Sequence, residues 1–471
     1  MLQAIGVIIV VVIALGAVGT GCGSGPKDTQ SPVDAPDSFS RTGEVVAPTQ
    51  WWRSFDDQNL DDLVERAFQG NFTLRQARAK LAQAAAVIRR EGARWYPNID
   101  GTVSGDVLSS RRRNARGASS DNSQSAFLGL AAGFEVDVWG RIEAGVDAAR
   151  FDAESEYQDM HVVAISLSAE VAVTWYRLVE QYGQLAILDQ QIKTNEQVLE
   201  LVTFRFQQGQ VGAADVLRQR QLLESTREDR IAAAATMKVL EHALLVLLGE
   251  TPGGSAFDHA SKLPTVPAVP DTGLPAELIR RRPDVRSTFF DLAAADRRAA
   301  AAIADQYPRI SLSASANLNS EYIRDIFDNW LASLAANLVA PVFDAGRRAA
   351  EVDRAEAVID QRLHEYGQVI LDALREVEDA LVQEDHQRRK IESIEKQRVL
   401  ADDVVRRLRD QYNNGATPYL DVLSALASYQ RLQRRHITAE RQEVEFRIDL
   451  YRALAGPFEI PESVNQSVGQ P

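Results

Sequence analysis

The chain of 471 residues has few of the residue types that build disulfide scaffolds, metal centres or catalytic sites. Its single cysteine, Cys22, excludes a disulfide within the chain. The histidines are scattered, and the pair His364 and Glu365 lacks the second histidine that a zinc-binding helix needs. Neither a G-x-x-x-x-G-K-[ST] phosphate loop nor a G-x-S-x-G nucleophile motif is present. These absences predict a protein that is not an enzyme and has no catalytic residue, metal site or cofactor.

Positive charge is also in short supply. Lysine and arginine total 52 against 66 aspartates and glutamates, which gives a formal net charge of -14 and a pI near 5.1. A nucleic-acid binder needs a basic face that replaces the counterions of the phosphates, so no nucleic-acid partner is expected. The apolar share of 45% and the charged share of 25% are those of ordinary globular material.

The N-terminus reads as a targeting segment. An apolar run from Ala4 to Val18 is too short to span a membrane comfortably and ends at small residues, which predicts a signal peptide over residues 1–21. Residues 22–50 are rich in Gly, Ser, Pro and Asp, so we expect a flexible tether there.

The end of this segment resembles a bacterial lipoprotein signal. Gly21 precedes Cys22, and the resemblance implies a lipid on the Cys22 thiol and, because Gly23 rather than aspartate follows, sorting to the outer membrane. Two features depart from that pattern: Gly19 stands where leucine is usual, and no lysine or arginine precedes the apolar run. An incidental thiol is therefore the alternative.

The sequence repeats itself. The stretch "TFRFQQGQVGAADVLRQ" returns as "RDQYNNGATPYLDVLSA", with Gly415 standing 206 residues after Gly209 and Asp421 the same distance after Asp215. The match continues on both sides, and one small insertion or deletion per half accounts for the change of offset near the N-terminal ends of the halves. We therefore expect a tandem duplication rather than a chance alignment of alanine-rich helices. The resulting division is a first repeat over 51–249, a linker over 250–274, a second repeat over 275–455 and a tail over 456–471.

Each half contains one very long segment without helix breakers. Residues 141–208 and 347–412 contain no proline, and at ~1.5 Å per residue each predicts a helix of about 100 Å. Gly209 and Gly415 fall where a left-handed glycine ends a helix, and Thr417 with the following proline suits the start of a returning helix. The repeated phrases are therefore expected to be the tips of antiparallel helical hairpins. The first long segment has a heptad seam typical of a coiled coil, formed by Leu178, Leu185, Ile192, Leu199 and Phe206, with Leu188 and Val202 at the second seam position.

Strands with alternating apolar and small polar residues are expected near 97–110, 124–139, 309–320 and 330–343. A soluble hairpin would show the same period, but runs of about ten alternating residues also suit the lipid and lumen faces of an outer-membrane strand. Four strands cannot close a barrel, and an open edge cannot remain in lipid. Closure therefore requires two chains, with a filled interior, or three chains, with a lumen.

At this point the sequence resembles the outer membrane factor family, the TolC-like channels, and in particular their lipid-anchored efflux branch. The resemblance covers about residues 50–456 and rests on the motifs "LRQARAKLAQAAA", "FEVDVWGR", "PVFDAGRR" and "YNNGATPYLDVLSA". It implies a mainly α fold with a membrane β-barrel: a homotrimer whose twelve-stranded barrel continues into a periplasmic coiled-coil tunnel. It also implies a periplasmic adaptor protein and an inner-membrane transporter, here expected to be proton-driven, as partners besides outer membrane lipid.

The resemblance further implies a periplasmic gate at the helix tips. Asp421 falls on an aspartate of the constriction and Tyr412 on an aromatic residue that holds the tips closed. Thr417 and Ser424 stand where some members have a basic and a second acidic residue, so closure is expected to rely more on packing and hydrogen bonds. Gly209, Asp215, Gly415 and Thr417 are assigned to the tips and to adaptor docking, with a plain helix-start role as the alternative for Asp215.

The expected function is that of a passive exit duct for small toxic compounds or drugs in a tripartite efflux system, opened by the adaptor and energised by the transporter. A lipid-tethered periplasmic coiled-coil scaffold and a type I protein secretion duct are the alternatives. A basic run between the first two strands, Arg111 to Arg113 and Arg116, is interpreted as a solvated loop or as a contact for anionic headgroups.

Overall fold

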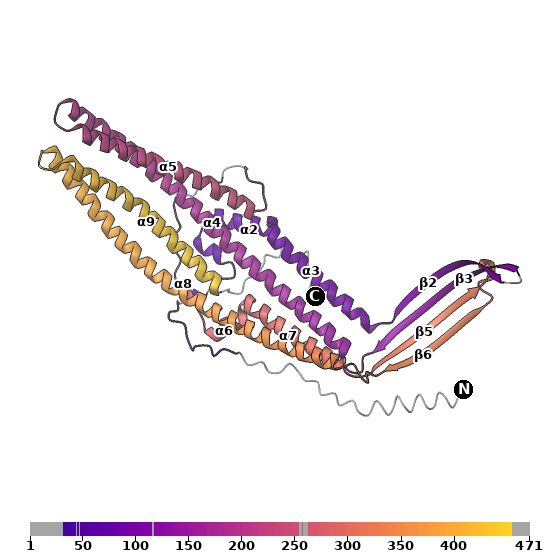
Figure 1. Ribbon diagram of the computed structural model, residues 1–471. Helices are drawn as coiled ribbons and strands as arrows, with labels where there is room; N and C mark the ends of the chain where they lie inside the picture. Colours follow the sequence, from indigo (N-terminus) through magenta and orange to yellow (C-terminus); the bar gives the residue numbers. More distant parts are fainter. Residues whose placement is uncertain are drawn as a thin grey trace.

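The computed structural model describes residues 32–454 apart from 44, 47, 115–116, 254–256 and 258–261. The expected signal peptide, Cys22, the first part of the tether, Arg116 and the tail over 456–471 lie outside the described residues. The described chain is elongated, with a four-stranded sheet at one end and helical hairpins at the other (Figure 1).

Two helices of 67 residues run along the helical part, α4 over Arg141–Gln207 and α8 over Arg347–Asn413. Each returns from its distal end in a shorter helix, α5 over Ala213–Leu247 after α4 and α9 over Tyr419–Leu454 after α8. Nearer the sheet, α3 (Phe72–Gly92) packs on α4, and α7 (Pro283–Ala304) lies between α4 and α8. The same three-helix plan therefore occurs in both halves of the sequence.

α4 is the central helix of the protomer. It contains a stretch apolar enough to cross a membrane, but 67% of that stretch is buried inside the protein. The burial comes from contacts with α3, α5, α7, α9 and α2 (Gln58–Gly70). Its apolar character is therefore that of a core helix.

Both hairpin tips use the same backbone device. Gly209 has φ of 71° and Gly415 has φ of 74°, a conformation that costs a residue with a Cβ free energy. The amide after each glycine donates back to the carbonyl five residues earlier, Gln210 to Arg205 at 2.9 Å and Ala416 to Gln411 at 2.8 Å. This Schellman motif satisfies the last carbonyls of each long helix and turns the chain back. The first helical residue after the second tip is Tyr419, one position later than the Thr417 and Pro418 pair suggested.

The heptad seam read off the sequence is buried only in part: Leu188 and Val202, at its second seam position, are buried as expected. Leu178 is buried, but Leu185, Ile192 and Leu199 are half-buried and Phe206 is 44% exposed. The positions buried in the distal half of α4 are Gln184, Leu188, Gln191, Asn195 and Val202. The reason is that α4 packs against α5 and α9 together, so its buried stripe is shifted toward α9 and includes polar residues.

The sheet is antiparallel in the order β2-β3-β5-β6. Its strands are β2 over Asn98–Asn114, β3 over Gly117–Val136, β5 over Arg309–Ser320 and β6 over Trp330–Val339, with a short helix η3 (Ile323–Asp325) between the last two. A strand lies at each of the four expected places, but β2 and β3 extend further toward their shared turn, and β3 and β6 end earlier than expected, at Val136 and Val339. Arg111 to Arg113 accordingly lie within β2 and pair with β3, because the ladder continues to Asn114 opposite Gly117.

The register gives the sheet one apolar face. Val103, Leu128, Leu318 and Trp330 stand in one row across the four strands. Nearer the helices, the same face carries the row Ile99, Ala132, Ala314 and Leu334 and the row Val136, Ile310 and Leu338. The other face carries mainly small and polar residues, with Ser315 and Ser333 hydrogen-bonded across strands at 2.8 Å, and has Leu108, Phe127, Leu331 and Val339 as large apolar exceptions. Within the described chain, the outer edges of β2 and β6 have no partner strand.

The passage from β3 to α4 is braced by local contacts and by contacts with the second half of the chain. The side chain of Arg141 forms a bidentate ion pair with Glu135 at 2.7 Å, and the indole of Trp139 donates to the carbonyl of Pro308 at 2.8 Å. Trp139 also stacks on Tyr307, with ring centroids 4.9 Å apart. The motif "FEVDVWGR" thus ties the end of β3 to the start of α4 and to the residues before β5.

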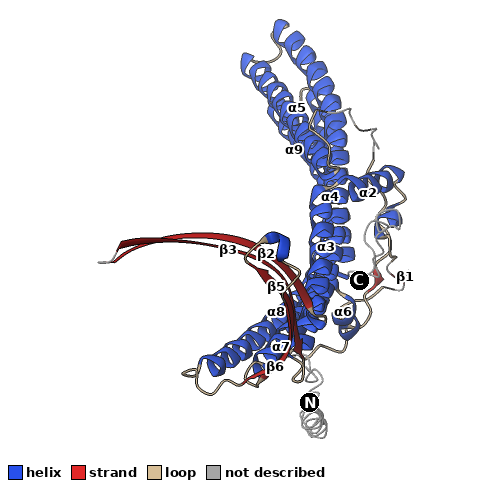
Figure 2. Ribbon diagram, turned by 90° about the vertical axis from the view of Figure 1, so that its right-hand side faces the viewer, coloured by secondary structure: helices blue, strands red, loops and turns tan. Residues whose placement is uncertain are grey.

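A layer of short elements covers one side of the long helices, and we call it the belt. It consists of η1 (Trp51–Phe55), α2, α6 (Pro275–Arg281) and the linker between the repeats, whose β4 (Pro270–Asp271) pairs in parallel with β1 (Val45–Val46). Figure 2 shows α2, β1 and α6 gathered on the same side of the helical part. The aromatic side chains of η1 and α2 pack on Trp175, Tyr176 and Tyr451 in the largest apolar core. The linker is held by Arg447, which donates to the carbonyls of Pro267 and Ala268 and forms a buried ion pair with Glu384 at 2.6 Å.

Candidate functional site at the helix tips

All four tip helices of the protomer contribute to one small apolar core, which we call the tip cluster. Its buried members come from α4, α8 and α9, and partly buried residues of α5 and of the first turn join them. The cluster comprises Val198, Val202, Val211, Val216, Leu408, Tyr412, Tyr419, Val422 and Leu423. Because the first hairpin (α4 and α5) and the second hairpin (α8 and α9) share this core, separating them exposes apolar surface to water.

Tyr412 lies at the centre of the tip cluster. It is 8% exposed, and its hydroxyl is buried without a hydrogen-bond partner among the described atoms. The guanidinium of Arg205, on α4, lies 4.6 Å from the centroid of the Tyr412 ring and donates to Asn413 Oδ1 at 3.0 Å. A cation over an aromatic face is attracted by the ring quadrupole, so Arg205 connects the end of α4 to the end of α8.

Tyr419 is the second aromatic residue of the cluster, with its ring 5.5 Å from that of Tyr412. Its hydroxyl donates to Oε1 of Gln219, on α5, at 2.6 Å, and both side chains are buried. Burial raises the pKa of Tyr419, so the phenol remains a donor at any physiological pH. This bond joins the second hairpin to the first.

A buried row of polar side chains continues this connection away from the tips, and we call it the polar seam. Gln219 also donates to the backbone carbonyl of Asn195 at 2.9 Å, and the side chain of Asn195 exchanges hydrogen bonds with Gln430 and donates to Thr226. Gln191 then donates to the carbonyl of Gln430 at 3.0 Å. The side chains of the seam find their hydrogen-bond partners inside the protein, and most of these bonds join one hairpin to the other. The seam therefore sets the register of the two hairpins as well as holding them in contact.

The other residues singled out from the sequence lie around the cluster. Asp421 is exposed and accepts a hydrogen bond from the Thr417 hydroxyl at 2.9 Å. Asp215 forms an ion pair with Arg218 at 3.2 Å in the first turn of α5. Gly209 and Gly415 form the two turns. The structure therefore brings Tyr412 into the shared core and places Asp421 outside it, at the surface of the tip.

Sequence reasoning missed Arg205, Tyr419, Gln219 and the polar seam. Two signals were available. Asn195 is a polar residue at a heptad position between Leu188 and Val202, and Tyr419 has alanine, Ala213, as its counterpart in the first repeat. Differences between the repeats mark the places where the two hairpins have different neighbours.

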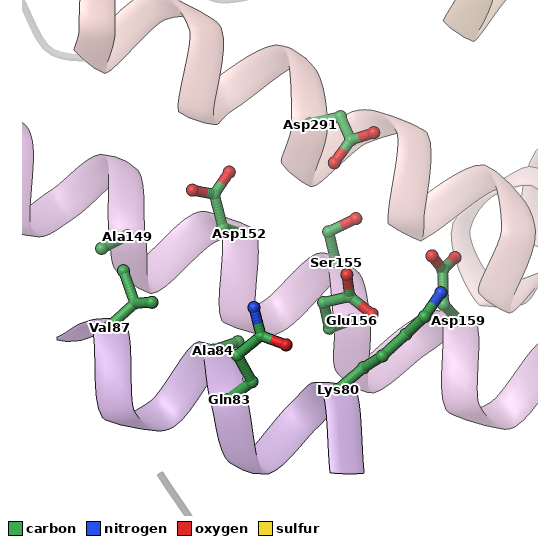
Figure 3. A pocket seen from close by; sticks show the side chains of 10 residues that line it. All are labelled: Lys80, Gln83, Ala84, Val87, Ala149, Asp152, Ser155, Glu156, Asp159 and Asp291. Atoms are coloured by element: carbon green, nitrogen blue, oxygen red, sulfur yellow. The ribbon is translucent and has the colours of Figure 1, made fainter. Parts of the chain in front are cut away.

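An acidic cavity of about 450 Å³ lies nearer the sheet, between α3, α4 and α7 (Figure 3). Its carboxylates have partners: Asp159 accepts from Ser287 at 2.6 Å, Asp291 lies 3.7 Å from Arg362, and Asp152 pairs with Arg298. Burial raises the pKa of Glu156, the remaining carboxyl. No cluster of three or more His, Cys, Asp or Glu is arranged to hold a metal ion in the part of the chain that the structure describes.

The sheet and the tips together define a class of protein. A sheet that is apolar on one face, has two unpaired edges and continues into helices about 100 Å long is the protomer of an oligomeric membrane channel. The apolar face suits lipid, and closure of the sheet pairs the free edges of neighbouring copies.

The chain belongs to the outer membrane efflux protein family, whose model matches residues 63–250 and 274–456. It is 29% identical over 456 residues to the pyoverdine export outer membrane protein OpmQ of Pseudomonas aeruginosa, covering 93% of this chain and 94% of that protein. It is 27% identical over 453 residues to the cation efflux system protein CusC of Escherichia coli K12, covering 93% and 96%. Solved structures of the outer-membrane channel OprN and of CusC each superpose with a TM-score of 0.83 at 26% identity; the matches cover 92% of this chain and 99% and 100% of those chains.

These findings confirm the resemblance read from the sequence, the fold class and the channel function. The protein is an outer membrane efflux channel: a trimer whose barrel continues into a periplasmic helical tunnel, in a family of channel proteins that work with an adaptor and an inner-membrane transporter. The comparisons support neither the periplasmic scaffold nor the type I secretion duct.

Proposed function

We propose that this channel is a passive exit duct for small toxic compounds that rests closed at its helix tips and performs no catalysis. The observation that carries the proposal is the tip cluster, a core shared by both hairpins at the end of helices that start at a membrane-type sheet. In a trimer, three such clusters meet around one axis and reduce the opening. The free energy for transport comes from the partner in the inner membrane.

Closure rests on packing and hydrogen bonds. Tyr412 and Tyr419 fill the tip cluster, the Tyr419 hydroxyl is bonded to Gln219, and Arg205 covers Tyr412. Asp421 contributes differently: as an exposed carboxylate near the mouth, repeated three times, it attracts cations and repels anions at the entrance. The tip residues Gly209 and Gly415, which are exposed, and Asp215 and Thr417, which are half-buried, supply the surface on which the adaptor docks to draw the hairpins apart.

The transporter that feeds this duct is of the proton-driven kind, and it sets the choice of cargo. Support for the second point, the choice of cargo, comes from the diversity of the similar channels, which include a pyoverdine export protein and a cation efflux protein at comparable identity. A duct framework shared by such different systems imposes little specificity of its own.

The mature chain is anchored to the outer membrane by lipid on Cys22. The tether starts at this residue, and its described end packs on α8, where Ser40 donates to Glu378 at 2.8 Å. Mass spectrometry of the purified protein tests the anchor. Expected is a lipid adduct on the Cys22 peptide that is lost in Cys22→Ser; an unmodified peptide in the wild type rejects it.

Conductance of purified trimer in planar bilayers tests the duct. We expect rare openings for the wild type, frequent stepwise openings for Tyr412→Ala, and for Asp421→Ala little change in open probability but a lower preference for cations. If no stepwise conductance appears with either variant, although the trimer is intact, the duct proposal is wrong.

A further inference from the structure

A basic cavity lies between the two hairpins on the sheet side of the tip cluster. It has a volume of about 340 Å³ and is formed by α9 with α4 and α8 beside it. Its lining includes Lys390 from α8 and Arg431, Arg434 and Arg435 from α9, with the amides of Gln184 and Gln442. Four cations share one cavity in a chain whose net charge is -14.

Three of these cations are not neutralised. Arg434 pairs with Asp229 at 3.0 Å, but no carboxylate in the described part of the chain lies within ion-pairing distance of Arg431, Arg435 or Lys390. The Lys390 ammonium instead donates to the side-chain oxygen of Gln442 at 3.1 Å. Most other arginines of α8 and α9 have an acidic partner one turn away, such as Arg398 with Glu395 and Arg406 with Asp403. The cavity therefore concentrates positive charge that no carboxylate of the described chain neutralises and that a bound anion can contact.

The cavity lies on the side of the helices that faces away from the belt. On α9, Val444 and Tyr451 pack into the core under the belt. Val444 follows Arg435 by nine residues, which at about 100° per residue places the two side chains roughly on opposite faces of the helix. A belt inside the tunnel would obstruct it, so the belt lies outside and Arg435, with its neighbour Arg431, faces the axis of the duct.

We propose that Arg431, Arg435 and Lys390 form an anion-binding site in the wall of the duct, and that it takes small organic anions carrying carboxylate or phosphate groups. Guanidinium groups match the geometry of these anions with paired hydrogen bonds, and the amide of Gln184 or Gln442 supplies a neutral donor beside them. The inference rests on the proposed duct. The trimer then has three equivalent sites around its axis. From the helical rise of ~1.5 Å per residue, these sites lie about 15–20 Å further into the duct than the ring of Asp421. Anions that pass the acidic mouth are held there, which favours their onward passage.

The test uses purified full-length trimer in planar bilayers, with Tyr412→Ala present throughout to keep the tips open. Citrate, a tricarboxylate, is added on the tip side, and its block of the current and the ratio of anion to cation permeability are measured. The test variant is Arg431→Ala with Arg435→Ala, and Arg431→Lys with Arg435→Lys preserves the charge. Arg53→Ala is the control for loss of positive charge away from the cavity: Arg53 pairs with Glu65 on the belt, and its substitution removes a charge from the outer side.

We expect citrate to block the parent channel. The double alanine variant should need at least about tenfold more citrate for the same block, because two charged hydrogen-bond donors are lost. Its permeability ratio shifts toward cations, the lysine variant stays near the parent, and the belt variant is unchanged. The site assignment is overturned if the double alanine variant conducts and citrate blocks it as it blocks the parent. A lack of all conductance would instead count against the duct itself.

Discussion

The Tyr419→Phe substitution isolates one hydrogen bond between the hairpins. It removes the hydroxyl that donates to Gln219 Oε1 at 2.6 Å and leaves the aromatic ring in the tip cluster. Gln219 is fully buried, at 0% exposed, so in the closed state its oxygen loses its partner and has no access to water. When the hairpins separate, water reaches that oxygen, and the variant therefore favours the open state.

The expected size follows from the cost of a buried unsatisfied acceptor, about 1–3 kcal/mol per protomer. If the three protomers open together, the closed trimer loses about 3–9 kcal/mol, and the lower value already corresponds to roughly a hundredfold shift in the ratio of open to closed channels. Gln219→Leu combined with Tyr419→Phe removes both polar partners, so we expect this double variant to return most of the way to wild-type closure.

Open probability in planar bilayers is the direct assay, and growth inhibition by an antibiotic too large for porins reports the same change in cells. Tyr322→Phe is the control, because Tyr322 lies exposed between β5 and β6, far from the tips. If Tyr419→Phe trimers are intact and open no more often than wild type, the hairpins do not separate along the polar seam and the reasoning is refuted.

Three further predictions follow from other parts of the structure. Tyr412→Ala should raise open probability more than Arg205→Ala, because truncating a buried ring costs several times the ~0.5–1 kcal/mol of a cation–π contact near the surface. The reverse order would mean that Arg205 contributes more than Tyr412 to holding the tips closed. Leu312→Arg should destabilise the inserted barrel by about 2–4 kcal/mol, seen as loss of heat-resistant trimer on gels, whereas the Ser313→Arg variant, changed on the opposite face, should insert normally. If the two variants behave alike, the assignment of the lipid face is wrong. Arg447→Met should cost about 3–5 kcal/mol by leaving Glu384 buried and unpaired, measured as a lower Tm and faster proteolysis of the linker, while Arg452→Met, whose pair with Asp449 is nearly half exposed, should stay near wild type.

The fold was readable from the sequence to a large extent because its signals are local. Glycines at 209 and 415, proline-free segments of about 67 residues and strict alternation from Ile310 to Leu318 each act within a few residues of chain. The duplication doubled each signal. The sequence did not show which residues of the α4 heptad seam are buried. A helix that packs against two other helices has a buried stripe whose position depends on where the second helix lies.

The candidate site was readable only in part. Tyr412 was singled out and lies in the tip cluster, while Asp421 lies exposed beside it, and the roles of both as gate residues stay predictions. Tyr419, Gln219 and Arg205 act through partners about 200 residues away in the chain. No periodicity connects such pairs, so their contacts could not be inferred from spacing.

The sequence by itself determined the parts of this channel: rods of a given length, tips with left-handed glycines, and strands with one face for lipid. These depend on backbone sterics and on the periods of helix and strand, which neighbouring residues set. Only the tertiary structure decided that the hairpins share an apolar core and a polar seam, and that Arg431, Arg435 and Lys390 meet in one cavity. Those juxtapositions arise from packing helices from both halves of the chain side by side, and the free energy of such packing depends on every helix in contact rather than on any one segment.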